Sequence, residues 1–151
     1  MKKELSNSKE SKEQIQSTYN LIKIVLEQAR SNAYRAINSA MVNAYWQIGK
    51  IIVEEEQKGK ERAEYGVSLL KYLSQKLSDE FGRGFDESNL RNMRFFYLTF
   101  PICDALRPEL SWTHYRLLIR IEKELARNFY LIETVNNHWS TRELERQKFE
   151  T

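Results

Sequence analysis

The spacing of apolar residues predicts a long helix in the first third of the chain. From Ile15 to Ile51, apolar side chains recur at steps of three and four residues. Such steps place the side chains on one stripe of an α-helix. Small residues occupy part of this stripe, where a second helix could approach closely: Ala29, Ala33, Ala36, Ala40 and Ala44. The length exceeds that of an average globular helix, so the stripe favours packing on the rest of the domain, pairing with a second copy, or both.

Two further helices are predicted around a short turn that contains glycine. Apolar residues at helical spacing run from Val67 to Phe81, and the sequence then reads Phe81-Gly82-Arg83-Gly84-Phe85. Glycine adopts the positive φ angles that commonly end a helix. Asp86 has the side chain of an N-cap, and Phe85 and Leu90 stand at the two positions of a hydrophobic staple. A helix, a short turn and a capped helix together predict a helix-turn-helix-like unit.

The same spacing assigns an inward face to the later helices. The helix after Asp86 is expected to bury Leu90, Met93, Tyr97 and Phe100, and to stop before Pro101. Ser111 is expected to cap a helix that carries Tyr115 and Leu118. Residues 124–137 are expected to bury Leu125, Phe129 and Ile132, with Val135 as a further inward position. Ser140 and Glu143 match a capping box that opens a last helix.

Composition supports an all-α fold, a helical bundle with a long N-terminal helix and a helix-turn-helix-like centre. The 151 residues are 41% hydrophobic, which suffices for a core, and they include only 5 glycines and 2 prolines. An all-β sandwich needs turn residues at shorter intervals. We predict a disordered tail over 1–12, a helical domain over 13–139, and over 140–151 the start of a helix leading to a domain that is absent.

Candidate chemistry for an enzyme is sparse. The single cysteine, Cys103, excludes an internal disulfide, and His114 and His138 match no metal-ligand spacing. No phosphate-binding loop occurs. We therefore assign no catalytic residue, metal or cofactor, and only a remote alternative makes Cys103 a nucleophile with His114 as its base. With neither a signal peptide nor a membrane span, the chain is expected to be cytoplasmic.

Arginine patterning indicates a nucleic-acid surface, although the net charge is only +3. No lysine occurs between Lys76 and Lys123, and the planar fork of arginine suits phosphates and guanine edges. Opposite the predicted inward face, the capped helix presents Ser88, Arg91 and Asn92. Arginine reads guanine, asparagine reads adenine, and serine binds phosphate. The further candidates are Arg83, Arg94, Thr113, His114 and Arg116.

The arginines and His114 each have an alternative interpretation that does not involve DNA. The arginines could equally pair with Asp and Glu on the surface of a helical bundle, and the spacing alone gives both interpretations similar weight. His114 lies at the start of a capped helix, where a lone histidine more often has a packing or capping role.

Several motifs, taken in order, resemble the N-terminal domain of the YhcG family of bacterial proteins, long catalogued as a domain of unknown function. They cover the chain from about residue 30 to its end. The matching residues are Trp46, Ile48 and Gly49; Tyr65-Gly66; Leu73 and Leu77; Phe81-Gly82-Arg83-Gly84-Phe85; Asn89-Leu90; Met93-Arg94; Phe96-Tyr97; Leu110-Ser111-Trp112-Thr113-His114-Tyr115; Arg127; Phe129-Tyr130; Trp139-Ser140; and Arg142-Glu143-Leu144-Glu145-Arg146-Gln147.

The resemblance implies a DNA-recognition region ahead of a nuclease. Members of the family typically continue into a C-terminal PD-(D/E)xK nuclease domain, in which strands carry the metal-binding acids. This chain stops at Thr151, inside the helix that begins near Ser140. Glu10-Ser11-Lys12 and Glu56-Gln57-Lys58 match the acid-x-Lys triplet in letters only, because neither has a strand context. No catalytic or metal residue is therefore carried over.

The predicted function is that of a non-catalytic DNA-binding and positioning module of a YhcG-like nuclease. Its expected partners are double-stranded DNA, the C-terminal nuclease domain of the full-length protein and a second copy in a homodimer, with no membrane. The alternative is a protein-interaction or dimerisation module that docks the nuclease domain or a partner protein.

Overall fold

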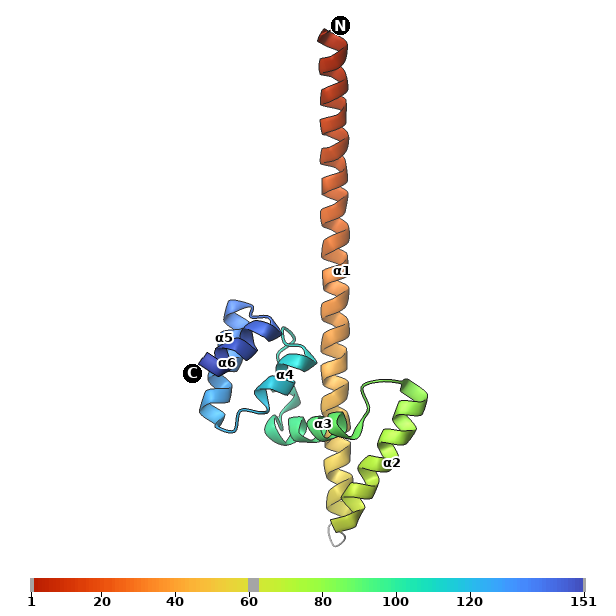
Figure 1. Cartoon of the computed structure of the whole chain (residues 1–151), viewed down its shortest axis with the longest axis vertical. Coiled ribbons are helices and arrows are strands. Elements are labelled where there is room, and N and C mark those ends of the chain that lie inside the picture. Colours follow the sequence, from red (N-terminus) through yellow and green to blue (C-terminus); the bar gives the residue numbers. More distant parts are fainter. Residues whose placement is uncertain (1, 60–62, 151) are drawn as a thin grey trace. The chain divides into compact units, whose positions relative to one another are not determined.

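The fold is all-α, as predicted. The computed structural model describes residues 2–59 and 63–150 (Figure 1). These residues form six α-helices, one short 3-10 helix and no strand. In chain order the elements are α1 (Lys2–Lys58), α2 (Ala63–Phe81), α3 (Glu87–Thr99), η1 (Cys103–Ala105), α4 (Trp112–Leu118), α5 (Glu124–Asn137) and α6 (Thr141–Glu150).

The chain divides into two compact units, residues 1–37 and 38–151, and α1 contributes to both. The structure differs from the prediction at the N-terminus, because residues 2–12 are helical rather than a disordered tail. This segment is polar, but it lacks glycine and proline, and its lysines and glutamates are good helix formers. Every residue from 2 to 37 is exposed.

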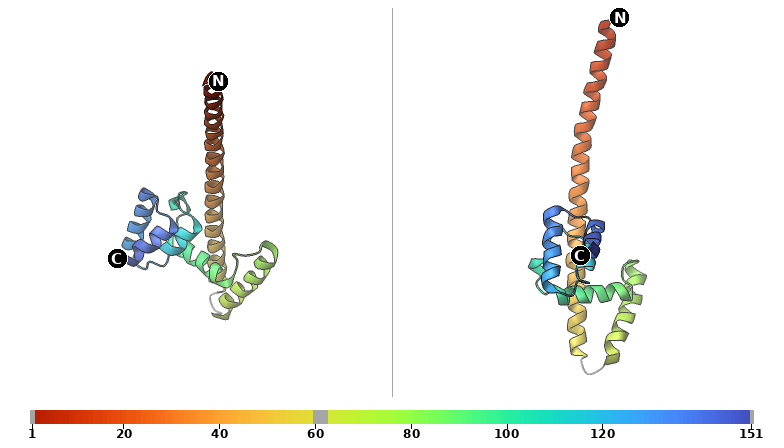
Figure 2. Two further views of the ribbon diagram at one scale, coloured as in Figure 1. Left: turned by 45° about the horizontal axis from the view of Figure 1, so that its top comes forward. Right: turned by 60° about the vertical axis from the view of Figure 1, so that its left-hand side comes forward.

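The larger core of the second unit gathers side chains from α1, α3, α4, α5 and α6. Figure 2 shows α4, α5 and α6 grouped together, and α3 leads from this group to α2. The buried residues of this core are Val42, Trp46, Phe96, Leu110, Tyr115, Leu117, Leu118, Ile119, Tyr130 and Leu144. Trp46 satisfies its indole by donating from Nε1 to the carbonyl oxygen of Phe100 at 2.6 Å. A buried indole generally needs such an acceptor.

A smaller core joins α1, α2 and α3. It consists of Ile52, Leu70, Leu90 and Met93. At Gly49 the backbones of α1 and α3 approach so closely that a Cβ atom there would lie 2.1 Å from the carbonyl oxygen of Met93. Glycine is required at such a backbone contact because it has no side chain.

The inward face of α3 is only partly as predicted. Leu90 and Met93 are fully buried, as expected, but the third buried residue is Phe96. Tyr97 and Phe100 are half-buried at the edges of this face. Aromatic residues stand at 95, 96 and 97, so apolar spacing could not fix the rotation of the helix.

The predicted inward face of α5 is wrong except at Val135, which is partly buried against the larger core. Leu125, Phe129 and Ile132 are exposed, and the buried residues are Tyr130 and Thr134. The helix is apolar on more than one side, so its spacing fits two rotations. Thr134 tolerates burial because its hydroxyl donates to the carbonyl oxygen of Tyr130 at 2.6 Å. A hydroxyl satisfied within its own helix carries little desolvation penalty.

Candidate nucleic-acid interface

The turn between α2 and α3 has the predicted glycine geometry. Gly82 and Gly84 have φ angles of 82° and 106°, in the region that other residues avoid. Asp86 then caps α3, since its carboxylate accepts a hydrogen bond from the amide of Asn89 at 2.7 Å. The side-chain amide of Asn89 donates back to the carbonyl oxygen of Gly84. These contacts fix the direction in which α3 leaves the turn, and Arg83 lies exposed within that turn.

The outward face of α3 carries the three residues that the sequence predicts there for DNA contact. Ser88, Arg91 and Phe95 are exposed, and Asn92 is half-buried beside them. They stand at positions i, i+3, i+4 and i+7, which share one face of a helix. The only acidic residue of α3 is Glu87, in its first turn. The face is therefore polar or aromatic, with a cation and no acid among these four residues.

Arg94 occupies a different environment. Its Nε donates to Oε2 of Glu56 at 2.6 Å, and the exposed fractions of the two side chains are 37% and 18%. This ion pair ties α3 to the end of α1. A pair this short and partly shielded is stronger than an open surface pair. Binding of Arg94 to a phosphate would compete with this contact.

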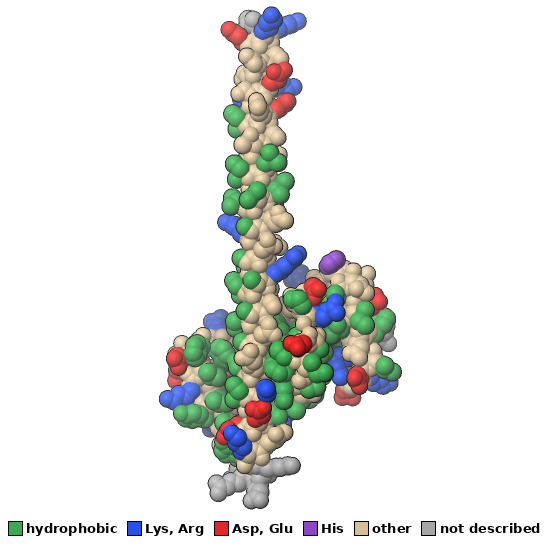
Figure 3. Space-filling model, turned by 180° about the vertical axis from the view of Figure 1, so that it is seen from behind, with side chains coloured by type: hydrophobic (Ala, Val, Ile, Leu, Met, Phe, Trp, Pro, Cys, Tyr) green, Lys and Arg blue, Asp and Glu red, His purple; other side chains and the backbone are tan. Residues whose placement is uncertain are grey.

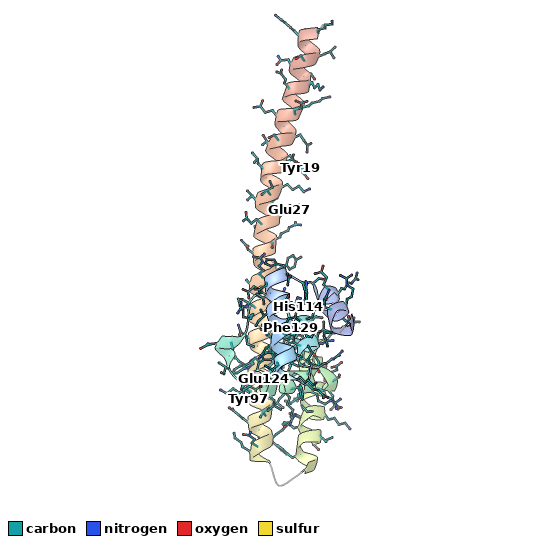
Figure 4. The ribbon with its side chains drawn as sticks, turned by 90° about the vertical axis from the view of Figure 1, so that its left-hand side faces the viewer. Tyr19, Glu27, Tyr97, His114, Glu124 and Phe129 are labelled. Atoms are coloured by element: carbon teal, nitrogen blue, oxygen red, sulfur yellow. The ribbon has the colours of Figure 1, made fainter. Side chains whose placement is uncertain are left out.

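His114 holds the start of α4 in place (Figure 4). Its Nδ1 accepts from the amide of Ser111 at 3.1 Å, so Nε2 carries the proton and donates to the carbonyl oxygen of Trp139 at 2.9 Å. Ser111 in turn accepts at Oγ from the amide of His114. These bonds form a capping box and connect α4 to the α5–α6 junction. Both ring nitrogens are thus engaged, as the structural alternative for His114 predicts.

The first turns of α3 and α4 lie side by side. Trp112 donates from Nε1 to Oδ1 of Asn89 at 3.2 Å, and its ring packs against Tyr45 and Phe96 at 5.0 and 5.2 Å between centroids. The exposed Thr113 follows Trp112 in the first turn of α4, so it lies near the start of α3. Of the eight predicted residues, all but Arg83 lie on these two helices. Ser88, Arg91 and Thr113 are the exposed ones among them.

Arg116 lies further along α4 and is half-buried. Its Nε atom is buried and has no hydrogen-bond partner among the residues that the structure describes. A buried donor without an acceptor costs free energy. Arg116 is therefore the candidate whose own surroundings leave a hydrogen bond unmade.

Two groups, one in α4 and one next to its end, have shifted pKa values. Burial raises the pKa of Tyr115 to about 12, against a smaller opposing effect of the Arg107 amide, which donates to the phenol oxygen at 2.7 Å. Burial also lowers the pKa of Lys148, and the charge of Arg120 lowers it further. Lys148 donates to the carbonyl oxygen of Leu117 at 2.9 Å, so α6 places a cation at the end of α4.

The ion pair between Arg94 and Glu56 could not be found from the sequence. The two residues are 38 positions apart, and Glu56 stands in an acidic run, Glu54-Glu55-Glu56. Adjacent acids at a helix end are usually solvated. Only the packing of α1 on α3 brings this one carboxylate beside an arginine.

The remote enzyme alternative gains no support from this geometry. Cys103 contacts Asn43, with 3.8 Å between Sγ and Oδ1, while His114 is bonded to Ser111 and Trp139. Across residues 2–59 and 63–150 there is no group of three His, Cys, Asp or Glu side chains that could hold a metal ion. In the same part of the chain, no helix is long and apolar enough to cross a bilayer.

Comparison with known proteins decides the family. The sequence model of the protein family described as the DUF1016 N-terminal domain matches residues 21–150. The chain belongs to the DUF1016 N-terminal domain family. It is also 35% identical over 155 residues to an Escherichia coli (strain K12) protein described as "Putative nuclease YhcG", covering 82% of this chain. The predicted resemblance to the YhcG family is therefore confirmed.

The family match extends over nearly all of the second unit and part of the first. This chain spans 41% of the length of its Escherichia coli relative. No solved structure matches it.

Proposed function

We propose that this DUF1016 N-terminal domain binds double-stranded DNA and positions a nuclease on it, without cutting DNA itself. The description of the Escherichia coli relative as a putative nuclease supports a nuclease as the associated activity. The relative is much longer than this chain, which leaves room for a separate catalytic domain in it. The cleavage chemistry is assigned to that part of the relative and not to α1–α6.

The observation that carries the proposal is the outward face of α3. It combines an exposed Arg91, an exposed Ser88 and a half-buried Asn92 on a helix that follows a short, rigidly capped turn. A recognition helix of this kind enters the major groove and reads bases with residues near its N-terminus. Ser88, Arg91 and Asn92 are the second, fifth and sixth residues of α3.

Each residue has a distinct proposed contact. Arg91 suits the two acceptors of guanine, and Asn92 suits the donor and acceptor of adenine. Ser88 and Thr113 suit phosphate oxygens, and the guanidinium group of Arg116 suits a phosphate as well. Phe95 suits the methyl group of thymine. Arg94 and His114 are proposed only as secondary contacts, because each already holds the fold together through Glu56 or Trp139.

Fluorescence anisotropy with a labelled mixed-sequence duplex, measured over a series of salt concentrations, tests the proposal. Affinity is expected to fall steeply as salt rises, because phosphate neutralisation releases counterions. The double variant R91E/R116E should lose binding while circular dichroism shows unchanged helicity. The matched control is R35E/R142E, which reverses the same charge at two exposed arginines outside the proposed surface.

The outcomes separate specific from general charge effects. Retained binding in R91E/R116E, or equal loss in R35E/R142E, would show that α3 and α4 are not the DNA surface. A variant that loses one phosphate contact should lower the slope of log affinity against log salt by about 1. We expect this smaller slope for R116A, and relaxed base preference for R91A.

A second candidate function rests on a specific observation. Phe95 and Leu98 of α3 are 49% and 47% exposed, and exposed apolar neighbours often mark a protein contact. In this alternative, α3 docks the nuclease domain or a partner protein. If the chain fails to bind duplex even at low salt, and F95S weakens its affinity for the remainder of the full-length protein supplied as a separate polypeptide, docking replaces DNA binding as the function.

A further inference from the structure

The N-terminal part of α1 carries an apolar stripe that nothing in its own unit covers. Figure 3 shows hydrophobic side chains along this part of the helix. Among the stripe positions, Ile15, Tyr19, Ile22 and Leu26 are all more than half exposed. Helices of this kind draw most of their stability from packing of an apolar face. The stripe therefore requires a partner surface.

The stripe has the spacing of a coiled coil. From residue 15 to residue 40 the steps are 4, 3, 4, 3, 4, 3 and 4, which is the a/d pattern of a heptad repeat. The residues of this seam are Ile15, Tyr19, Ile22, Leu26, Ala29, Ala33, Ala36 and Ala40. Beyond it, Val42 and Trp46 are buried in the core of the second unit. The seam thus ends where α1 begins to pack against its own chain.

The two halves of the seam differ in size, and this difference identifies the occupant. The first four seam residues are large, and the last four are alanines. If a second copy lies antiparallel, each large residue faces an alanine: Ile15 faces Ala40, Tyr19 faces Ala36, Ile22 faces Ala33, and Leu26 faces Ala29. The spacing between helix axes depends on the side chains at the contact. Large against small therefore keeps that spacing constant along the whole seam.

A parallel pair would not have this property. It would place tyrosine on tyrosine and leucine on leucine in one half, and alanine on alanine in the other. The first half would hold the helices apart where the second needs them close. We propose that residues 15–40 of α1 form an antiparallel two-stranded coiled coil with a second copy of this chain. This pairing is independent of the proposed DNA-binding surface.

Charges beside the seam give the pairing a characteristic salt dependence. In the antiparallel register, Lys23 of one copy lies beside Arg30 of the other. Lys23 also pairs with Glu27 of its own helix at 3.8 Å, and both side chains are more than half exposed. Salt screens repulsion between exposed like charges. Added salt is therefore expected to tighten the dimer, whereas it weakens binding to DNA.

Sedimentation equilibrium of the full chain without DNA tests self-association. The wild type should be a dimer, with a dissociation constant that falls as salt rises. I22K should raise this constant by at least about 100-fold, because the pair would bury two unpaired charges. I24K is the matched control, since Ile24 lies off the seam and is as exposed as Ile22, at 58% against 55%. It should remain dimeric.

Cysteine cross-linking in a C103S background tests the direction of pairing. I22C alone should stay reduced, because the two introduced cysteines lie 11 residues apart along the axis, or about 16 Å. A disulfide requires Cα atoms within about 7 Å. I22C/A33C should form a covalent dimer on oxidation, because residues 22 and 33 face each other in the reverse pair.

Three results would overturn the inference. A monomer at every concentration would exclude self-pairing, and ready oxidation of I22C alone would show a parallel pair. Equal effects of I22K and I24K on the dissociation constant would show that the two copies do not meet along this seam. Because no DNA is present, none of these results bears on the DNA-binding proposal, which the salt titration of R91E/R116E tests separately.

Discussion

Gly49 is the position at which the packing of α1 on α3 can be tested most directly. Replacement by alanine adds one methyl group whose carbon would lie 2.1 Å from the carbonyl oxygen of Met93 and 2.8 Å from its carbonyl carbon. Ordinary contact begins near 3.4 Å. Both obstacles are backbone atoms, so no rotation of a side chain relieves the overlap. The helices must separate, or α3 must turn.

The expected magnitude follows from two opposing terms. Overpacking of this kind costs about 3 kcal/mol, the upper part of the usual range, because backbone has to move. Alanine is a better helix former than glycine by about 1 kcal/mol. The net loss in the free energy of unfolding should therefore be about 2 kcal/mol. For a domain of this size we expect the melting temperature to fall by about 8 °C.

Gly66 provides the matched control because it lies in α2 with open space around its Cβ direction. The nearest atom to a Cβ there would be Cγ of Glu56 at 3.9 Å, an ordinary contact. G66A should thus raise the free energy of unfolding by about 0.5 to 1 kcal/mol through helix propensity. Urea unfolding followed by circular dichroism measures both variants. If G49A is as stable as G66A, α1 and α3 do not approach as closely as described, and the placement of α3 fails with it.

Three further predictions concern α3 and α4. D86A should lower the free energy of unfolding by about 1 kcal/mol in urea titration, since the amide of Asn89 loses its cap; an unchanged midpoint would contradict the cap. H114A should lower it by about 2 kcal/mol, because it removes the capping box and the bond to Trp139; unchanged stability would contradict this structural role of His114. The pKa of Tyr115 is raised from 10.0 to about 12 in the folded chain. Its contribution to the free energy of unfolding is therefore complete below pH 10 and falls by about 2 kcal/mol as the pH rises to 12. Urea unfolding of Y115F and of the wild type at pH 8 to 12 should show that Y115F lacks this part of the loss of stability at alkaline pH.

Local features of the fold could be predicted from the sequence because their causes are local. The glycine turn, the Asp86 cap and the Ser140–Glu143 capping box depend on residues within a few positions of one another. The last of these is present, with Ser140 and Glu143 exchanging bonds of 3.1 and 3.2 Å. The family could also be predicted from the sequence, because the order and spacing of its motifs can be read without knowing how the helices pack.

The rotation of each helix about its own axis, which decides the face that it buries, could not be predicted in this way. Both α3 and α5 are apolar on more than one side, so periodicity allowed two buried faces for each. Packing then selected Phe96 rather than Tyr97, and Tyr130 with Thr134 rather than Phe129 with Ile132. The choice depends on which residues of distant helices fill the space, and spacing along one helix contains no such information.

The sequence by itself determined the helical class, the capped turn before α3 and the residue types that we propose for DNA contact. Only the tertiary structure decided which of those side chains are exposed and which are held by other residues. Arg91 remains exposed, whereas Arg94 is held by Glu56 and His114 by Ser111 and Trp139. The physical reason is that a side chain's chemistry is fixed by its type, but its availability depends on partners that folding brings from elsewhere in the chain.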